Sequence, residues 1–499
     1  MYRKKLYYLA FSILCLTNAA AQETEIKKYP AQMSIYHPMG THGRQSVQYT
    51  YNFSMNFLTG KVGGVQGLEI SGLYGRVENS VHGVQIAGLG NVVGDGMKGV
   101  QTSGLVNIVG DGMKGVQTSG IANIVGDGMK GVQTSGLVNI VGDGMKGVQT
   151  SGLVNIVGDE MKGVQTSGLV NIVGDEMKGW QTSGIANVVG DEMIGWQASG
   201  IANVVGDGMR GWQTSGIANV VGDEMKGWQA SGIANVVGDG MKGWQASVIA
   251  NIVGDEMKGM QTSGIANMVG DEMKGIQVSG IANAVDDMKG VQIAGIYNTT
   301  KSMTGLQISG VYNRNHTLRG LNIGLVSIND TIEKGISMSL VNIVKRGCYR
   351  EYELSFSDFA NLAFSYKMGM QKFYTIYTVG TTFMEDNLWL VGVGFGNRTH
   401  IGNRFDFQPE LVSYNYLPSN FKNVQSTFVT RLKFGFVYRI NEKFGLSLSP
   451  SLYWMNAEKR TNSDYYEISP AGAFYTKENN SGRMTMGVGI SLGLSIKHI

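Results

Sequence analysis

Cysteine and proline are scarce in this chain of 499 residues, which contains two cysteines and six prolines. Cys15 lies in an N-terminal segment that we expect to be removed, so Cys348 alone would remain and no intramolecular disulfide could form. No proline occurs between residues 41 and 408, although glycine is abundant with 73 residues. Because proline cannot donate to a β-ladder, its absence favours continuous backbone pairing over disorder.

Long apolar runs and an excess of charge of either sign are also absent. After the N-terminal segment, no stretch reaches the roughly 18 apolar residues of a transmembrane helix. The 41 basic residues include Arg3, Lys4 and Lys5, so removal of the N-terminus would leave 38 basic and 38 acidic residues. No cluster of lysine and arginine with interleaved aromatic residues occurs. A nucleic-acid partner is therefore not expected.

Residue patterns typical of catalysis are missing as well. None of the six histidines has a second ligand or base at a useful spacing: His37, His42, His82, His316, His400 and His498. No phosphate-binding loop, dinucleotide fingerprint or metalloprotease motif is present. Ser103 recurs in most repeats without a histidine or aspartate to activate it, so we interpret it as a corner residue. The sequence therefore predicts a protein that is not an enzyme and that has no cofactor.

The N-terminus has the features of a secretory signal peptide. A basic cluster precedes an apolar run at residues 6–16, and small residues up to Ala21 suit a cleavage site. The run is too short to span a bilayer. Leu14 stands where a lipoprotein signal requires a small residue, so acylation of Cys15 is not expected. We predict that residues 1–21 are cleaved and that the protein is exported.

A 16-residue unit, GVQTSGLVNIVGDGMK, dominates the chain. Twelve copies in register begin at Gly83, Gly99, Gly115, Gly131, Gly147, Gly163, Gly179, Gly195, Gly211, Gly227, Gly243 and Gly259. A longer copy precedes them at Gly64, and shorter copies follow at Gly275, Gly290, Gly305, Gly320 and Gly335. We predict an N-terminal segment with a capping strand at residues 22–63, tandem repeats of 15–16 residues at 64–345, and an antiparallel β domain at 346–499.

Each unit reads as two β half-strands and a polar turn. The half-strands, such as residues 100–102 and 105–109, are rich in β-branched residues, and residues 110–114 form the turn. Glycine recurs several times per unit and no apolar stripe of period 3.6 develops, so a helix is disfavoured. The predicted fold class is therefore all-β.

The lengths of the later repeats favour a β-solenoid. At residues 321–328 and 336–343 the linker between the half-strands is one residue shorter than at 100–108. In one continuous strand, such a deletion would turn every later side chain to the opposite face, so it is tolerated only at a corner or bulge. We predict one coil per unit, with corners near Ser103 and at residues 110–114.

Stacking of coils would place identical residues in columns. Asn107 and its equivalents would form an amide ladder, and the irregular terminal units would cap open edges that otherwise invite aggregation. A rival interpretation makes each unit a spanning strand of one large antiparallel outer-membrane β-barrel with a pore or transport function.

The pattern Gly-Val-Gln-x-x-Gly-Leu-Val-Asn-Ile, with a later form at residues 290–298, resembles the repeat of a family of surface-repeat proteins of Gram-negative bacteria. The resemblance extends to residues 339–344, Ser-Leu-Val-Asn-Ile-Val, which lead through a turn into strand-like segments. Together these parts cover most of the mature chain. The resemblance implies an exported, envelope-associated protein, and it assigns no activity to any residue.

Strands are also predicted on both sides of the repeats. Apolar and polar residues alternate over residues 47–57, which indicates one amphipathic strand. After residue 349, roughly eight strands in about 150 residues match the scale of a small outer-membrane β-barrel. The clearest lie at residues 428–439 and 484–496. A soluble antiparallel sheet packed against the end of the repeats is the alternative.

The second position of the unit varies most informatively. Valine gives way there to five consecutive tryptophans, Trp180, Trp196, Trp212, Trp228 and Trp244. A coil interior filled by valine would be overpacked by indoles, at a cost of about 1–3 kcal/mol each, so the row should face outward. An exposed aromatic row is a candidate platform for a glycan, a lipid or a partner on an envelope or host surface. Alternatively, Ala202 and its equivalents, which replace Val106, make room for the rings inside.

A column of turn aspartates at Asp111 and its equivalents could bind Ca²⁺. Each coil supplies mainly one aspartate, and Lys114 can neutralise it, so we predict a solvated turn and no metal. A polysaccharide-degrading solenoid would need clustered carboxylates outside the turns, and none is visible. The sequence thus predicts an exported outer-membrane or cell-surface protein with a structural, adhesive or binding role.

Overall fold

The protein is described by a computed structural model that covers residues 27–383, 388–418, 427–458, 472–479 and 482–498. The predicted signal peptide, residues 1–21, lies outside the described residues. The fold is all-β, with a solenoid of about 17 coils followed by an eight-stranded antiparallel β-barrel, which confirms the predicted fold class. The described part of the chain contains one short helix, η1 (Gly43–Gln48). Within it, no helix has the length and apolar character that crossing a membrane requires.

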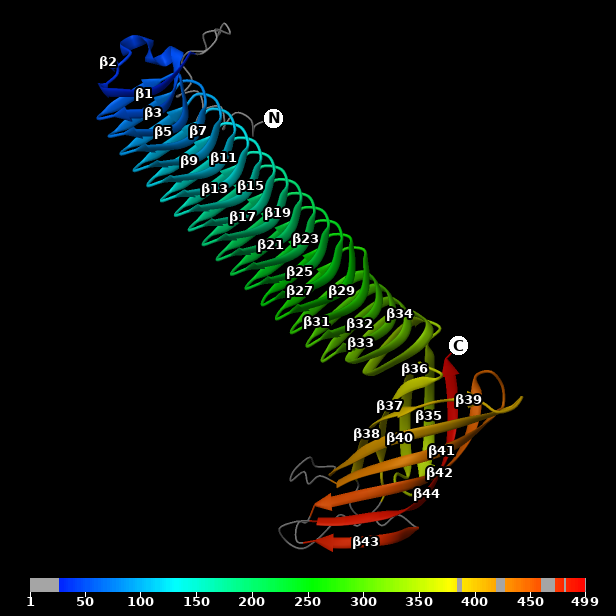
Figure 1. Ribbon diagram of the computed structural model, residues 1–499. Coiled ribbons are helices and arrows are strands. Elements are labelled where there is room, and N and C mark those ends of the chain that lie inside the picture. The colour runs from blue at the N-terminus through cyan, green and yellow to red at the C-terminus, as the bar shows by residue number, and fades with distance from the viewer. Residues whose placement is uncertain (1–26, 384–387, 419–426, 459–471, 480–481, 499) are drawn as a thin grey trace. The chain divides into compact units, whose positions relative to one another are not determined.

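The chain divides into two compact units, residues 1–191 and 192–499, which we describe in turn. In unit 1, each coil contributes one longer and one shorter strand, coloured blue to green in Figure 1. The longer strands are β5 (Gly64–Ser71), β7 (Val81–Ala87), β9 (Met97–Ser103), β11 (Met113–Ser119), β13 (Met129–Ser135), β15 (Met145–Ser151), β17 (Met161–Ser167) and β19 (Met177–Ser183). The shorter strands are β4 (Thr59–Val62), β6 (Tyr74–Val77), β8 (Gly90–Val93), β10 (Val106–Val109), β12 (Ala122–Val125), β14 (Val138–Val141), β16 (Val154–Val157), β18 (Val170–Val173) and β20 (Ala186–Val189).

Neighbouring coils pair in parallel, with identical residues opposite one another. Strand β11 pairs with β9 so that Met113 lies opposite Met97, and β12 pairs with β10 so that Asn123 lies opposite Asn107. The repeat period of the sequence is therefore the length of one coil. Parallel stacking excludes the rival interpretation, in which the repeats would run antiparallel around a large barrel.

The corner between coils is shorter than predicted. Only residues 110–112 separate β10 from β11, and Met113 and Lys114 already belong to the strand. Lys114 is exposed, whereas Met113 is 1 % exposed and fills the coil interior. The prediction that both residues belong to a polar turn was wrong. The Gly-Asp-Gly before Met113 hides the start of the strand in the sequence, and the flexible side chain of Met113 packs inside the coil.

The other inward residues of a coil are mostly polar. In β9 and β10 they are Gln101, Ser103, Asn107 and Val109, all buried. Asn107 Nδ2 donates to Asn123 Oδ1 of the next coil at 3.0 Å, which confirms the predicted asparagine ladder. A buried amide is stable only when its hydrogen bonds are made, and stacked identical coils make them repeatedly.

The N-terminal end of unit 1 continues the stack with β3 (Tyr49–Asn56) and β1 (Lys27–Tyr36), which pairs with β3 in parallel. A short strand, β2 (Met39–Gly40), folds back antiparallel on β1. From Ser54 onward the polar side chains of β3 face inward. The apolar side chains of the alternating pattern predicted for residues 47–57 therefore point outward in this part of the strand. The reason is that Ser54 and Asn56 continue the polar interior of the coils.

Unit 2 begins with the same coil pattern. Its longer strands are β21 (Met193–Ser199), β23 (Met209–Ser215), β25 (Met225–Ser231), β27 (Met241–Ser247), β29 (Glu256–Ser263) and β31 (Glu272–Ser279). Its shorter strands are β22 (Ala202–Val205), β24 (Ala218–Val221), β26 (Ala234–Val237), β28 (Ala250–Val253) and β30 (Ala266–Val269). In the 15-residue repeats, the corner is absorbed into long strands, β32 (Ala282–Ala294), β33 (Tyr297–Ser309) and β34 (Tyr312–Arg346).

The barrel follows the coils in unit 2. Its strands, in spatial order, are β35 (Tyr349–Ser357), β36 (Leu362–Met370), β37 (Phe373–Thr381), β38 (Leu388–Gly396), β40 (Phe405–Pro418), β41 (Thr427–Arg439), β42 (Phe444–Glu458) and β44 (Gly482–His498). Pairing of β44 with β35 closes it. Two further strands, β39 (Thr399–His400) and β43 (Ala473–Asn479), pair with β40 and β44. Thr375 Oγ1 in the barrel donates to the Ser339 carbonyl of β34 at 2.7 Å.

Candidate functional site

The five tryptophans occupy the same place in successive long strands. Each follows the glycine in the middle of its strand, with Trp180 in unit 1 and the other four in unit 2. Their side chains are between 43 % and 56 % exposed. The outward orientation predicted for the row is thus present, and the alternative, that Ala202 and its equivalents make room for the rings inside the coil, is wrong.

The four tryptophans of unit 2 form one continuous stack, which we call the tryptophan row. Strand pairing places Trp196 opposite Trp212, Trp212 opposite Trp228, and Trp228 opposite Trp244. Their ring centroids are 4.8, 4.9 and 5.1 Å apart, with interplanar angles of 6°, 3° and 4°. This spacing is that of neighbouring strands, about 4.8 Å, so the backbone ladder sets the distance between rings.

The residue after each tryptophan fixes the strand beneath the row. Gln213 Nε2 donates to Gln197 Oε1, and Gln229 Nε2 donates to Gln213 Oε1, both at 2.8 Å. These glutamines are at most 1 % exposed. Because alternate side chains of a strand point to opposite faces, an inward amide held on both sides holds the adjacent indole outward. The glutamine ladder therefore fixes the strands that carry the tryptophan row.

Stacking determines what the row offers to a partner. The two inner rings, Trp212 and Trp228, each have an indole on both faces, so they present their edges rather than an open ring face. Exposed Arg210 and Lys242 lie two residues before their tryptophans on the same side of the strands. The result is an apolar ridge with cationic side chains beside it.

The barrel has a second surface of functional interest. On β44, Val488, Ile490 and Leu492 are between 51 % and 59 % exposed, whereas Ser491 and Ser495 are buried. Large apolar side chains on the other barrel strands are likewise exposed, among them Leu354, Phe364, Val391, Leu411, Phe436, Leu448 and Trp454. The outer face of the barrel is thus apolar, whereas its interior holds both buried polar residues and a buried apolar cluster that includes Tyr374, Leu390 and Val429.

A cluster of charged side chains occupies part of the barrel interior. Lys367 Nζ lies 2.6 Å from Glu410 Oε1 and 3.2 Å from Glu351 Oε1, and it also contacts Glu353. Lys433 Nζ lies 2.9 Å from Glu410 Oε2. Sequence reasoning missed this cluster. The alternation in the strands was visible, but only closure of the barrel shows that the strand sides bearing Lys367, Glu410 and Lys433 face inward.

The remaining candidates are the corner serine, the corner aspartate and the histidines. Ser103 is buried at the end of β9, and Asp111 is exposed in the corner. Among the described residues, no three histidine, cysteine, aspartate or glutamate side chains come together in a way that could hold a metal ion. His400 Nδ1 contacts Asp406, and His42 Nδ1 lies 3.0 Å from the Tyr51 hydroxyl.

Comparison with known proteins adds no assignment: no model of a protein family matches the chain, and no curated protein matches it.

Proposed function

We propose that this protein is an exported outer-membrane protein whose barrel is inserted in the bilayer and whose coils present a binding surface. The observation that carries the proposal is the apolar outer face of the barrel, on which Ile490 and Leu492 are exposed, together with the charged cluster of Lys367, Glu351 and Glu410 buried inside. In a water-soluble domain, exposure of so much apolar surface to water would be unfavourable. An eight-stranded barrel is also the smallest size common in outer membranes.

The proposed role is structural and adhesive rather than transport. The inside of an eight-stranded barrel is just wide enough to be filled by side chains, and the ion pairs of Lys367 and Lys433 cross it here. The tryptophan row is the proposed contact surface for an extended glycan or a lipid of an envelope or host surface. Tryptophan combines a large apolar area with a polar N–H group, as such interfaces require.

Insertion of the barrel is tested by expressing the full chain with its signal segment and separating the membranes. We expect the protein in the outer-membrane fraction, resistant to carbonate extraction, and with heat-modifiable migration in gel electrophoresis. Recovery as a soluble protein without detergent would contradict insertion.

Binding by the row is tested with Trp212→Val and Trp228→Val combined. Valine occupies the same position in the coil of Val164, so this change restores the commonest form of the repeat. We expect the coils to remain folded while the binding of extended glycans on an array, or of anionic lipid vesicles, is reduced. Equal binding by the parent and variant proteins would contradict a role for the row.

A further inference from the structure

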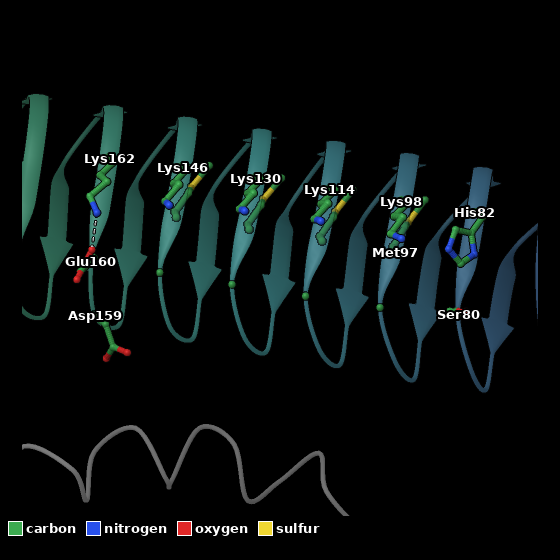
Figure 2. A pocket seen from close by; sticks show the side chains of 17 residues that line it. Ser80, His82, Met97, Lys98, Lys114, Lys130, Lys146, Asp159, Glu160 and Lys162 are labelled. Carbon is green, nitrogen blue, oxygen red and sulfur yellow. Dashed lines mark hydrogen bonds and ion pairs between the residues drawn. The ribbon is translucent and has the colours of Figure 1, made fainter. Parts of the chain in front are cut away.

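A groove of about 600 Å³ runs along several coils of unit 1, far from the tryptophan row in sequence. It begins at Ser80 and His82 and ends at Asp159, Glu160 and Lys162. Between these ends, every coil contributes a glycine, a methionine and a lysine to its walls. Figure 2 shows the lysines in a single row, each from its own strand.

One position of the repeat decides where the groove lies. The residue before the methionine is glycine in four consecutive coils, at Gly96, Gly112, Gly128 and Gly144, and glutamate in the next, at Glu160. Glu160 occupies the space that the glycines leave open, and its carboxylate pairs with Lys162 at 2.8 Å. Farther along, the sequence has only isolated glycines at this position, Gly208 and Gly240. Four open coils in succession are therefore particular to this segment.

The same glycines leave a row of cations without carboxylate partners. Lys98, Lys114, Lys130 and Lys146 are exposed, and none of them forms an ion pair with a described residue within 4.0 Å. Strand pairing places each opposite the next, about one strand spacing apart. Like charges at this distance repel, so binding of an anion along the row would relieve the repulsion.

The corner aspartates form no ion pair with this row among the described residues. Asp95 and Asp111 each precede a glycine of the groove, yet neither side chain lines it. Partial burial and, after it, the charge of Asp111 raise the pKa of Asp95. Among the residues that line the groove, carboxylates occur only at its Glu160 end.

We propose that this groove binds a linear acidic polysaccharide, whose carboxylates lie along the row formed by Lys98, Lys114, Lys130 and Lys146. The lysines stand in single file about 4.8 Å apart, so the groove presents a continuous line of cations to a polymer that carries a negative charge on each unit. Lysine is a compact charge on a flexible stem, which accepts a carboxylate without fixed geometry. This proposal is independent of membrane insertion and of the tryptophan row.

Nucleic acid fits the same groove less well. Single strands are normally held by bases stacked on aromatic side chains, and the only aromatic ring in the lining is that of His82 at one end. Phosphates of one strand of a duplex follow one another at about 3.4 Å along the axis, which does not match the spacing of the coils.

The test measures binding of fluorescent oligogalacturonate to the detergent-solubilised full-length protein, with dextran and single-stranded DNA as comparison polymers. Parent protein should bind oligogalacturonate in a salt-dependent manner and should not bind dextran. Lys114→Gln with Lys130→Gln should weaken binding about tenfold or more. The matched control, Lys226→Gln, removes a lysine already paired with Glu224 at 2.9 Å and should leave binding unchanged.

A second pair of variants tests the role of the glycines. A Cβ atom at Gly112 would lie 3.2 Å from the Gly128 carbonyl oxygen, so a side chain fits after a small adjustment. Gly112→Glu should weaken binding by filling the groove and pairing with Lys114, as Glu160 does with Lys162. Glu160→Gly should lengthen the groove by one coil and strengthen binding. Unchanged binding in the lysine and glycine variants, or tighter binding of DNA than of oligogalacturonate, would overturn the proposal.

Discussion

Gln85 Nε2 donates a hydrogen bond of 2.8 Å to Glu69 Oε2, and this contact ends a ladder of glutamine amides in unit 1. Each glutamine of the ladder, from Gln181 down to Gln101, donates to the glutamine of the preceding coil at 2.8–2.9 Å. All amide donors thus point the same way, and Glu69 is the final acceptor. A carboxyl group suits this position because one of its oxygens accepts the last amide hydrogen bond in either protonation state.

Replacement of Glu69 by glutamine should remove a pH dependence of stability at this end of unit 1. Burial raises the pKa of Glu69 from its usual 4.5 to about 7, while hydrogen bonds from Gln85 and Asn56 partly oppose the shift. The folded state therefore favours the protonated carboxyl group. Protonated Glu69 therefore contributes on the order of 3 kcal/mol to the free energy of unfolding. This contribution is fully present below pH 4.5 and is lost as the pH rises through about 7.

Hydrogen exchange in β3, β5 and β7 measures this effect. After correction for intrinsic rates, the parent should be better protected at pH 5 than at pH 8, whereas Glu69→Gln should be equally protected at both. Glu78→Gln is the control, because Glu78 pairs with Lys61 at the surface and its pKa is lowered. Equal pH dependence in the parent and in Glu69→Gln would contradict the assignment.

A break in the asparagine ladder should be costly. Asn139 is fully buried, and its Nδ2 donates to the Thr150 carbonyl at 2.6 Å and to Asn155 Oδ1 at 3.0 Å, while its Oδ1 accepts from Asn123 at 3.0 Å. Leucine has a similar shape but leaves these partners unpaired, at about 1–3 kcal/mol for each buried group. Asn139→Leu should therefore open its coil and the two neighbours to hydrogen exchange. The exposed Val132→Ala should change protection by less than about 0.5 kcal/mol.

Two glycines three residues apart should differ sharply in their tolerance of alanine. Gly115 has a φ of 135°, and a Cβ there would lie 1.9 Å from the Gly99 carbonyl oxygen. Gly112 has an ordinary φ, and its Cβ would lie 3.2 Å from the nearest atom. Gly115→Ala should lower the thermal stability of the coils, whereas Gly112→Ala should be nearly neutral. Circular dichroism melting of both variants makes the comparison, and equal melting temperatures would contradict it.

The period of the repeat predicted the solenoid, because in-register stacking makes every coil the same length. The size of the indole rings predicted that the tryptophans face outward, because five such rings would overpack a coil interior. In the structure, Val100 and its equivalents at the same position also lie on the outer face. The burial of Gln101 was not predictable from its polarity. Its environment becomes favourable only when the neighbouring coils supply Gln85 and Gln117 as hydrogen-bond partners.

The barrel illustrates the same limit of sequence reasoning. The alternation of Leu492 with Ser491 predicted a strand with two unlike faces, but it did not show which face is inside. That depends on closure of β44 against β35, a contact between residues about 140 positions apart in sequence. Likewise, the groove at Gly112 depends on which side of the coil the position before each methionine occupies.

Lys367 provides the sharpest test of the barrel interior. It is 1 % exposed and lies among Glu351, Glu353 and Glu410. Lys367→Met would leave three buried carboxylates with fewer cations, and removal of one partner from a buried charge cluster costs about 3–5 kcal/mol. We therefore expect the heat-modified gel shift to occur at a lower temperature and urea unfolding in detergent to need less denaturant. The exposed Lys372→Met should unfold like the parent, and unchanged unfolding of Lys367→Met would show that this cluster does not stabilise the barrel.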